Sequence, residues 1–153
     1  MNAKLNQLQL EQVQTSVEAY AGLMKRRTPP RGWLKLIRES LGLTERQQAA
    51  RLSISAPTLH KSEQAEADER ITLKQLRKLA EGLDCELVYA LVPRKPLTQM
   101  VAEQAHAIAL REVSEVAHTM SLEDQRPTET HLRRQVEQRA EELLRGRWSA
   151  LWR

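Results

Sequence analysis

Hydrophobic residues near the N-terminus recur at intervals of three and four positions, the spacing that places side chains on one face of an α-helix. The stripe consists of Leu10, Val13, Val17, Tyr20 and Met24. The sequence TPPRG at 28–32 should end this helix, because adjacent prolines cannot continue it and restrict the residue before them. We therefore predict an amphipathic helix and a basic linker over residues 1–30.

From Trp33 to Leu83 the pattern changes to a series of short helices. Gly42 stands where the first of them should stop. Hydroxyl residues that can cap a helix mark the later starts, two with a glutamine three positions on and one with a proline in the first turn. These signals are Thr44 with Gln47, Ser55 with Pro57, and Thr72 with Gln75. We assign residues 31–83 to one helical domain.

The sequence CELVYALVP at 85–93 is the one good strand candidate in the chain. A lone strand leaves its hydrogen-bonding edges unpaired, so it needs a partner. Because no second strand is evident, we expect the same strand of another protomer to supply the pairing. Residues 84–95 are thus predicted to form a short strand that pairs across a homodimer.

Residues 96–153 are predicted to form a helical region. A long amphipathic helix should run from Pro96 to Met120, SLEDQRP should break it, and a last helix should begin near Thr128. Trp148 and Trp152, four positions apart, are interpreted either as a hydrophobic lid on the core or as an anchor for a partner protein. Both alternatives stay open.

Composition excludes several classes of protein. Hydrophobic residues make up 41% and charged residues 29%, as in folded soluble proteins. No apolar run approaches the roughly 18 residues of a membrane span, and the N-terminus lacks a secretory signal pattern, so we expect a cytoplasmic protein without membrane contact. Cys85 has no cysteine partner, and the histidines lack metal-ligand spacing. We predict no catalytic site, no metal and no cofactor.

Two helices that begin near Thr44 and Ser55, with a very short turn between them, have the sequence form of a helix-turn-helix. Ala49 is small where the second helix should cross, and polar or small residues of the second helix should enter the major groove. Helix starts also present backbone N–H groups to phosphates. The candidate DNA-contacting residues of the two helices are Thr44, Arg46, Gln47, Ser55, Ala56, Pro57, Thr58, His60 and Lys61.

Positive charge gathers just before this domain. The net charge is +4, and residues 25–38 hold six basic side chains and no acidic one. We consider equally a basic arm that flanks DNA and a solvated linker. The arm would consist of Lys25, Arg26, Arg27 and Arg31.

The sequence LTERQQAARLSISAPTLHKSEQ at 43–64 resembles the lambda-repressor-like (Xre/Cro) helix-turn-helix family, whose usual form is L-T-Q-x-x-L-A-x-x-L-G-V-S-x-x-T-I-S-x-I-E. The resemblance covers residues 33–83. Identical positions are Leu43, Thr44, Ala49, Leu52, Ser55, Thr58 and Glu63, and Ile54 and Leu59 match by type. It implies an all-α, lambda-repressor-like domain, here with one short β-strand and long helical extensions.

A wider stretch is similar to the family called mobile mystery protein A. The similar parts are RGWLKLIRESLG, EADERITLKQLRKLAEGLDCELVYALVPRKPL and the helical tail. Members lie on mobile DNA beside a gene for a Fic-domain protein, in an arrangement like a toxin–antitoxin operon. The resemblance implies a regulator or antitoxin.

Four positions depart from the motif. Gln48 and Ser62 replace apolar residues and would each cost about 1–3 kcal/mol if buried without partners, although partial exposure would avoid that cost. Ser53 replaces the glycine of the turn, and Glu45 replaces a glutamine that often touches phosphate in this superfamily. A carboxylate at position 45 would repel the DNA backbone.

We expect a homodimer that binds a palindromic operator in double-stranded DNA and represses its own operon. The alternative is a protein-interaction module, an antitoxin whose terminal helices bind and restrain a partner Fic-domain enzyme.

Overall fold

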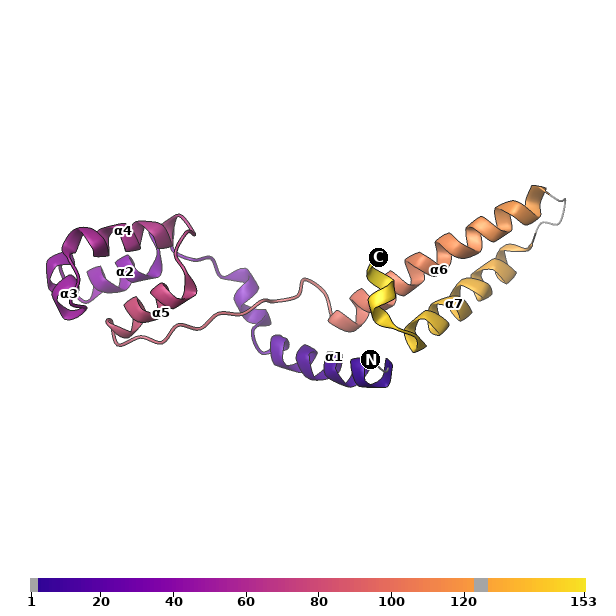
Figure 1. Cartoon of the computed structure of the whole chain (residues 1–153), viewed down its shortest axis with the longest axis horizontal. Helices are drawn as coiled ribbons and strands as arrows, with labels where there is room; N and C mark the ends of the chain where they lie inside the picture. The colour runs from indigo at the N-terminus through magenta and orange to yellow at the C-terminus, as the bar shows by residue number, and fades with distance from the viewer. Residues whose placement is uncertain (1–2, 123–126) are drawn as a thin grey trace. The chain divides into compact units, whose positions relative to one another are not determined.

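The computed structural model describes residues 3–122 and 127–153, and over these residues the protein is all-α (Figure 1). The α-helices are α1 (Ala3–Glu18), α2 (Trp33–Ser40), α3 (Glu45–Arg51), α4 (Ala56–Ala67), α5 (Leu73–Glu81), α6 (Leu97–Leu122) and α7 (Glu129–Arg145). Two 3₁₀-helices are η1 (Ala21–Lys25) and η2 (Trp148–Trp152). Within the described ranges, no helix has the length and apolarity needed to cross a membrane.

The chain folds into two compact units. The inserted unit comprises Leu23–Ala90, and the terminal unit combines the residues up to Gly22 with those from Leu91 onward. α1 and the α6–α7 region, far apart in the sequence, therefore belong to one unit, and each unit is described by itself below.

α1 is shorter than its sequence pattern predicts. It ends at Glu18, and Tyr20 and Met24 lie beyond it, so the prediction of one stripe reaching Met24 is wrong. No side chain of α1 is buried, so little packing favours a further turn of helix there. Gly22, a poor helix former, adds to this effect.

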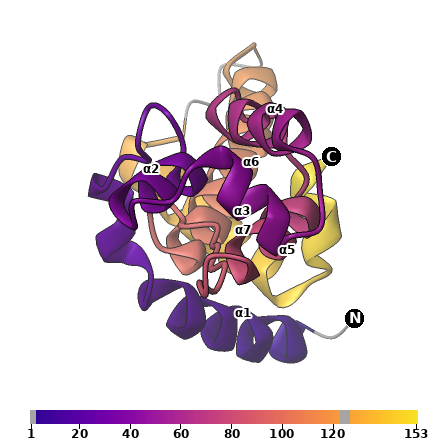
Figure 2. The same ribbon diagram turned by 90° about the vertical axis from the view of Figure 1, so that its left-hand side faces the viewer.

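The inserted unit packs α2, α3, α4 and α5 around one hydrophobic core. Both α2 and α3 pack against α4, and Figure 2 shows these helices from the side on which they face the viewer. The buried residues of the core are Leu34, Ala49, Leu59, Leu79 and Leu83. Each of the four helices supplies one of them, and Leu83 follows the end of α5.

The predicted helix starts of the inserted unit are confirmed. Thr44 and Gln47 form a complete capping box, in which Thr44 Oγ1 accepts from Gln47 N at 3.2 Å and Gln47 Oε1 accepts from Thr44 N at 2.9 Å. Ser55 and Thr72 each accept a hydrogen bond from the backbone N–H three residues on. These caps satisfy amide groups that a helix start otherwise leaves unpaired.

The predicted strand over residues 84–95 is not confirmed. Residues 85–92 carry no regular secondary structure, and no backbone hydrogen bond involves the described residues 86–94. Val88 and Tyr89 are 65% and 62% exposed. The physical reason is that a single extended segment has no second strand to pair with inside one protomer.

In the terminal unit α6 and α7 lie side by side and antiparallel, and α1 and η2 pack against them (Figure 1). Val101, Ala105 and Leu151 form the buried core. Ala105 and Ala109, both fully buried, let the neighbouring elements approach α6 closely. The long helix was predicted nearly to its end, and the predicted break includes residues 123–126, which lie outside the described ranges.

α7 begins as predicted, and the two tail tryptophans beyond its end lie in different surroundings. Thr128 caps the helix by accepting from His131 N at 3.3 Å. Trp148 packs against the core and donates from Nε1 to the Leu144 carbonyl at 2.7 Å, so it acts as part of a lid. Trp152 is 57% exposed, and it is Leu151 between them, 1% exposed, that fills the core.

Candidate nucleic-acid interface

The contact between α3 and α4 shapes the candidate site. Ala49 on α3 and Leu59 on α4 are each 2% exposed, which agrees with the expectation that a small residue lets the second helix approach. Ser53 in the turn has a φ of 55°, a left-handed conformation that favours glycine, as expected for the position where the motif carries one. The two helices thus form a rigid pair joined by a tight turn.

The outer side of α4 and its cap carry four of the residues predicted to contact DNA. Ser55, Pro57, Thr58 and Lys61 are exposed. The Thr58 hydroxyl lies 2.7 Å from the capping hydroxyl of Ser55, and Lys61 makes no hydrogen bond or ion pair with any described residue. Lys61 therefore offers an uncompensated positive charge on this surface.

Ala56 differs from the expectation. It is only partly exposed and packs against the core of the inserted unit, because its place at the start of α4 turns its methyl group inward. The prediction that Ala56 is exposed is therefore wrong, and its backbone N–H remains the group that the helix start presents.

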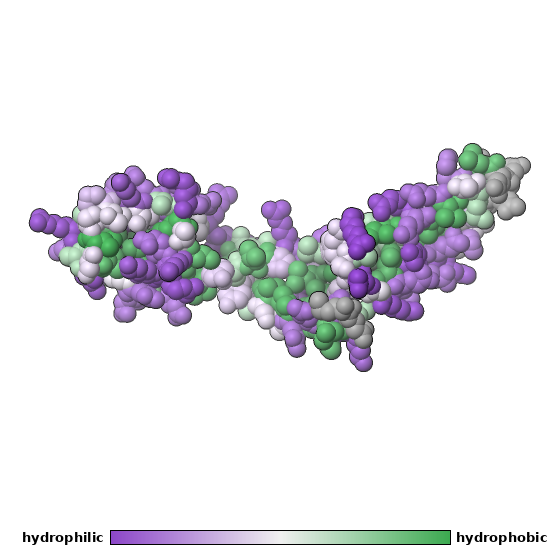
Figure 3. Space-filling view, viewed as in Figure 1, coloured by the Kyte–Doolittle hydropathy of each residue, from purple (hydrophilic) through white to green (hydrophobic). Residues whose placement is uncertain are grey.

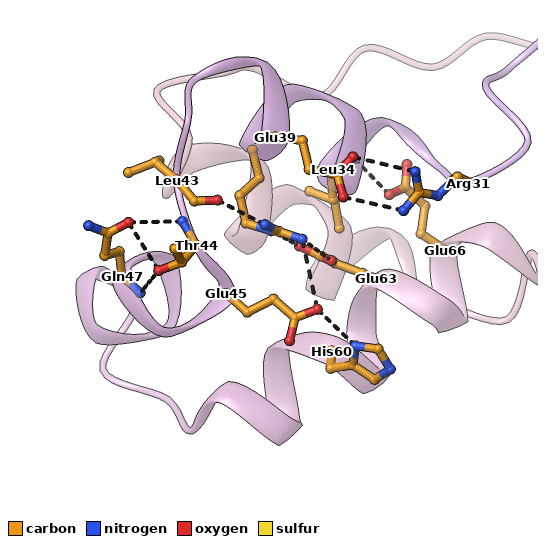
Figure 4. Close-up of polar contacts among 11 residues, drawn as sticks. Arg31, Leu34, Glu39, Leu43, Thr44, Glu45, Gln47, His60, Glu63 and Glu66 are labelled. Atoms are coloured by element: carbon orange, nitrogen blue, oxygen red, sulfur yellow. Dashed lines mark hydrogen bonds and ion pairs between the residues drawn. The ribbon is translucent and has the colours of Figure 1, made fainter.

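The start of α3 provides three further candidates, all exposed: Thr44, Arg46 and Gln47. The side chains of Thr44 and Gln47 are engaged in the capping box, as Figure 4 shows. Arg46 has no ion-pair partner among the described residues, so its guanidinium is available to an anion.

Glu45 is turned toward protein groups of its own unit. Its Oε1 accepts a hydrogen bond from His60 Nδ1 at 2.9 Å and lies 3.8 Å from Arg38 Nη2 (Figure 4). The hydrogen bond from His60, aided by the charge of Arg38, lowers the pKa of the Glu45 carboxyl below its ordinary value despite partial desolvation. The Glu45 carboxylate thus has partners within its own unit, and it holds His60 at the middle of α4.

A buried ion pair fastens α4 to α2. Arg38, counted from sequence only as part of a basic cluster, donates from Nε to Glu63 Oε1 at 2.6 Å and from Nη2 to Glu63 Oε2 at 3.0 Å. Its Nη1 also donates to the Leu43 carbonyl at 2.8 Å. The hydrogen bond to Glu63 raises the pKa of Arg38. Arg38 and Glu63 are 5% and 3% exposed, so this pair holds the angle of α4 and is not available to a ligand.

Glu66 makes a second link between α4 and α2. Its two carboxylate oxygens accept from Trp33 N at 2.8 Å and Leu34 N at 2.9 Å, so it caps the start of α2 from a distant part of the chain (Figure 4). Glu66 lies within α4, which continues through Ala67.

The predicted basic arm does not stay together. Arg31 is 3.3 Å from Glu39 and lines a cavity of about 300 Å³ that Lys35 and His60 also line, so it lies on the side of α4 that carries His60. Arg26 and Arg27 instead line a different cavity, against α2 and α5. Lys25 is exposed at the end of η1.

Gln48 and Ser62, the two polar residues expected at apolar positions, lie in different surroundings. Gln48 is 1% exposed, and neither its side-chain nitrogen nor its oxygen has a hydrogen-bond partner in the described structure. Ser62 is partly exposed and donates to the Thr58 carbonyl at 3.0 Å, so it carries no comparable penalty.

Among the residues with described positions, no cluster of three histidine, cysteine, aspartate or glutamate side chains could hold a metal ion. The candidate site consists of exposed polar and basic groups on α3, α4 and their caps. Comparison of the chain with known protein families, with characterised proteins and with solved structures finds no match.

Proposed function

We propose that this protein is a sequence-specific DNA-binding transcriptional regulator, an autorepressor and antitoxin-like protein of a mobile-element operon. In this proposal α3 and α4 form a helix-turn-helix and α4 enters the major groove. The observation that carries it is the exposed set on α4, Thr58 with the unpaired Lys61, beside the open start of α3. Lys61 suits a phosphate or a guanine edge, and Thr58 suits a thymine methyl group or a phosphate.

The buried links behind α4 support this proposal. A helix that reads base edges must hold its angle, because a loose site loses the contacts that discriminate bases. Glu63 and Glu66 both lie on the part of α4 beyond Lys61, and both are bound to α2. Both carboxylates are thus engaged with α2, while Thr58 and Lys61 on the outward side of α4 are exposed.

A palindromic operator requires two copies of the site. In a homodimer the two α4 helices would enter successive major grooves, about 34 Å apart. Phosphate contacts should make the affinity fall steeply as salt rises. Arg46 and Arg31 are the next candidates for those contacts, since both are exposed on the same unit.

A gel-shift titration with the DNA upstream of the gene tests the proposal. The double variant Thr58→Ala, Lys61→Ala should bind at least about tenfold more weakly, which corresponds to about 1.4 kcal/mol. A matched control is Thr130→Ala, Arg134→Ala, a pair of exposed residues on α7. Wild-type affinity in the first double variant would show that α4 does not read the DNA.

A second function is favoured by a specific observation in the terminal unit. A groove of about 650 Å³ lies between α6 and α7, and it is lined by Leu110, Val113, Ala117, Leu132 and Val136 among other residues. Hydrophobic residues, green, lie between hydrophilic ones along this pair on the face shown in Figure 3. Exposed apolar grooves of this kind commonly receive a partner protein. The Fic-domain enzyme implied by the resemblance is the partner that we propose.

Co-expression with the product of the neighbouring gene tests this second function. Leu110, 50% exposed in the groove, can be changed to aspartate without emptying a buried site. Leu110→Asp should abolish co-purification, whereas Leu73→Asp on α5, 48% exposed, should leave it intact. Deletion of the tail is a poorer test, because residues 146–153 include the buried Leu151.

A further inference from the structure

The inserted unit has an open apolar cavity on the side of α2 and α5. Its volume is about 590 Å³, and hydrophobic residues of both helices and of the following segment make up most of its lining. These residues are Trp33, Leu34, Ile37, Leu76, Ala80, Leu83, Cys85, Leu87 and Val88. Trp33 is 50% exposed there. Apolar surface of this extent, open to water, marks a place where something else binds.

The rim of the cavity is formed by a segment whose backbone lacks hydrogen-bond partners among the described residues. Residues 85–88 line the cavity, and the described residues 86–94 make no backbone hydrogen bond. Val88 and Tyr89 expose more than half of their surface. A segment with free amide groups and exposed β-branched and aromatic side chains is suited to pair with another strand.

The charges around the cavity are those of a self-complementary surface. Arg26, Arg27, Glu66 and Glu86 line it, and Glu66 is engaged with the backbone N–H groups at the start of α2. Arg26, Arg27 and Glu86 have no ion-pair partner among the described residues. In a contact with two-fold symmetry, each copy presents the same patch, so the arginines of one copy can face Glu86 of the other. A separate ligand would need its own matching pair of charges, which a second copy already has.

We propose that the occupant of this cavity is a second copy of the chain: segments 86–92 of two protomers pair as antiparallel strands, and apolar side chains of each segment enter the cavity of the other protomer. The inference deepens the proposed function, because it rests on the homodimer named there. The cavity is thus half of an interface that one protomer leaves incomplete, and the predicted strand forms only on assembly.

Sedimentation at a series of concentrations tests whether the chain self-associates through this cavity and segment. The wild-type chain should be a dimer, and Val88→Asp should raise its dissociation constant at least tenfold. Val116→Asp is the matched control, since Val116 on α6 is 60% exposed, close to the 65% of Val88. A chain that is monomeric at every concentration, or a dimer that Val88→Asp does not weaken, overturns the proposal.

Charge reversal tests whether Arg26 and Arg27 of one copy lie opposite Glu86 of the other. Glu86→Lys alone and Arg26→Glu, Arg27→Glu together should each weaken self-association, while an equimolar mixture of the two variants should form a mixed dimer of near wild-type affinity. If circular dichroism shows that both variants are folded and their mixture still does not associate, the proposed pairing of these arginines with Glu86 is wrong.

Disulfide trapping tests the strand pairing. Single cysteines are placed in turn at positions 86–92 of a Cys85→Ser parent and the protein is oxidised. An antiparallel pair brings a residue opposite itself only at the two-fold axis, and bridged Cα atoms lie within about 7 Å. Cross-linking should therefore peak at one position or two adjacent ones. A flat profile overturns the pairing.

These readouts separate this inference from the proposed function. Thr58→Ala, Lys61→Ala should leave the dimer intact while DNA binding falls. A monomeric protein that still binds its upstream DNA would end the dimer proposal and leave the DNA-binding proposal standing.

Discussion

Arg38 and Glu63 show how much a single buried pair of residues controls in the inserted unit. A carboxylate replaced by an amide leaves the buried Arg38 charge with only the partly exposed Glu45, 3.8 Å away, and the loss of one partner from a buried pair costs about 3–5 kcal/mol in the free energy of unfolding. That loss is comparable to the whole stability of a small domain. Glu63→Gln should therefore unfold the inserted unit or lower its urea midpoint strongly.

The control for this prediction is Glu39→Gln. Glu39 pairs with Arg31 at the surface, where both side chains are well exposed, and such pairs contribute at most about 1 kcal/mol. Equal effects of the two substitutions would show that the Arg38–Glu63 pair is not buried in solution.

Gln48 carries the opposite prediction. Both polar atoms of its side chain are buried without a partner. A buried polar group without a hydrogen bond destabilises the folded state by about 1–3 kcal/mol. Gln48→Leu removes the polar atoms and should raise the free energy of unfolding by about 1–2 kcal/mol in urea titrations. Gln64→Leu, at an exposed position of α4, should change it little. A destabilised Gln48→Leu variant would mean that the amide has a partner in solution.

The lowered pKa of Glu45 gives a pH dependence. Because the folded pKa is below the unfolded one, the stabilising contribution of Glu45 is present above the unfolded pKa and is lost as pH falls through the folded pKa. Since the hydrogen bond from His60 is the main cause, His60→Ala should raise the pKa of Glu45 toward its ordinary value. Carboxyl titration by NMR measures this directly. An unchanged pKa would assign the effect to Arg38 instead.

At the scale of elements, the start of α2 depends on one glycine. Gly32 has a φ of 81°, and a Cβ there would lie 2.7 Å from Glu66 Oε2, the atom that accepts from Leu34 N. Gly32→Ala should therefore strain the backbone and displace the cap of α2, at a cost of about 1–3 kcal/mol by thermal unfolding. Gly22→Ala is the control, because a methyl group added at Gly22 would meet no other atom within 4 Å. Equal melting temperatures would show that Glu66 does not cap α2 in solution.

At the scale of elements, the sequence predicted the local contacts and not the long-range ones. The starts of α3 and α4 were predictable, because Thr44 and Ser55 act on amides within three residues of themselves. The cap that Glu66 gives α2 was not, because it joins residues more than thirty positions apart. The strand predicted over residues 84–95 is not found, because a local run of Leu and Val does not supply the second segment that a strand must pair with.

The candidate site follows the same rule. The exposure of Thr58 and Lys61 follows from the periodicity of α4 and could be predicted from the sequence. The engagement of Glu45 with His60, and the separation of Arg26 and Arg27 from Arg31, depend on how helices pack. No local pattern encodes those relations.

At the scale of the whole molecule, the core of the inserted unit is built from that unit alone. A fragment of residues 23–90 should therefore remain helical and unfold cooperatively in urea. A fragment of residues 91–153 should be less stable than the complete terminal unit, because it lacks the packing of Leu10 against the core. Circular dichroism of both fragments measures this, and an unfolded 23–90 fragment would contradict it.

The insertion of one unit within the other also orders events on the ribosome. α1 is synthesised before the helices that pack against it, so Leu10, which packs against the core of the terminal unit, has no partner until those helices have emerged. The inserted unit needs no later residue for its core and can fold during that interval. A nascent chain would thus complete its proposed DNA-reading part before α1 has packed against α6 and α7.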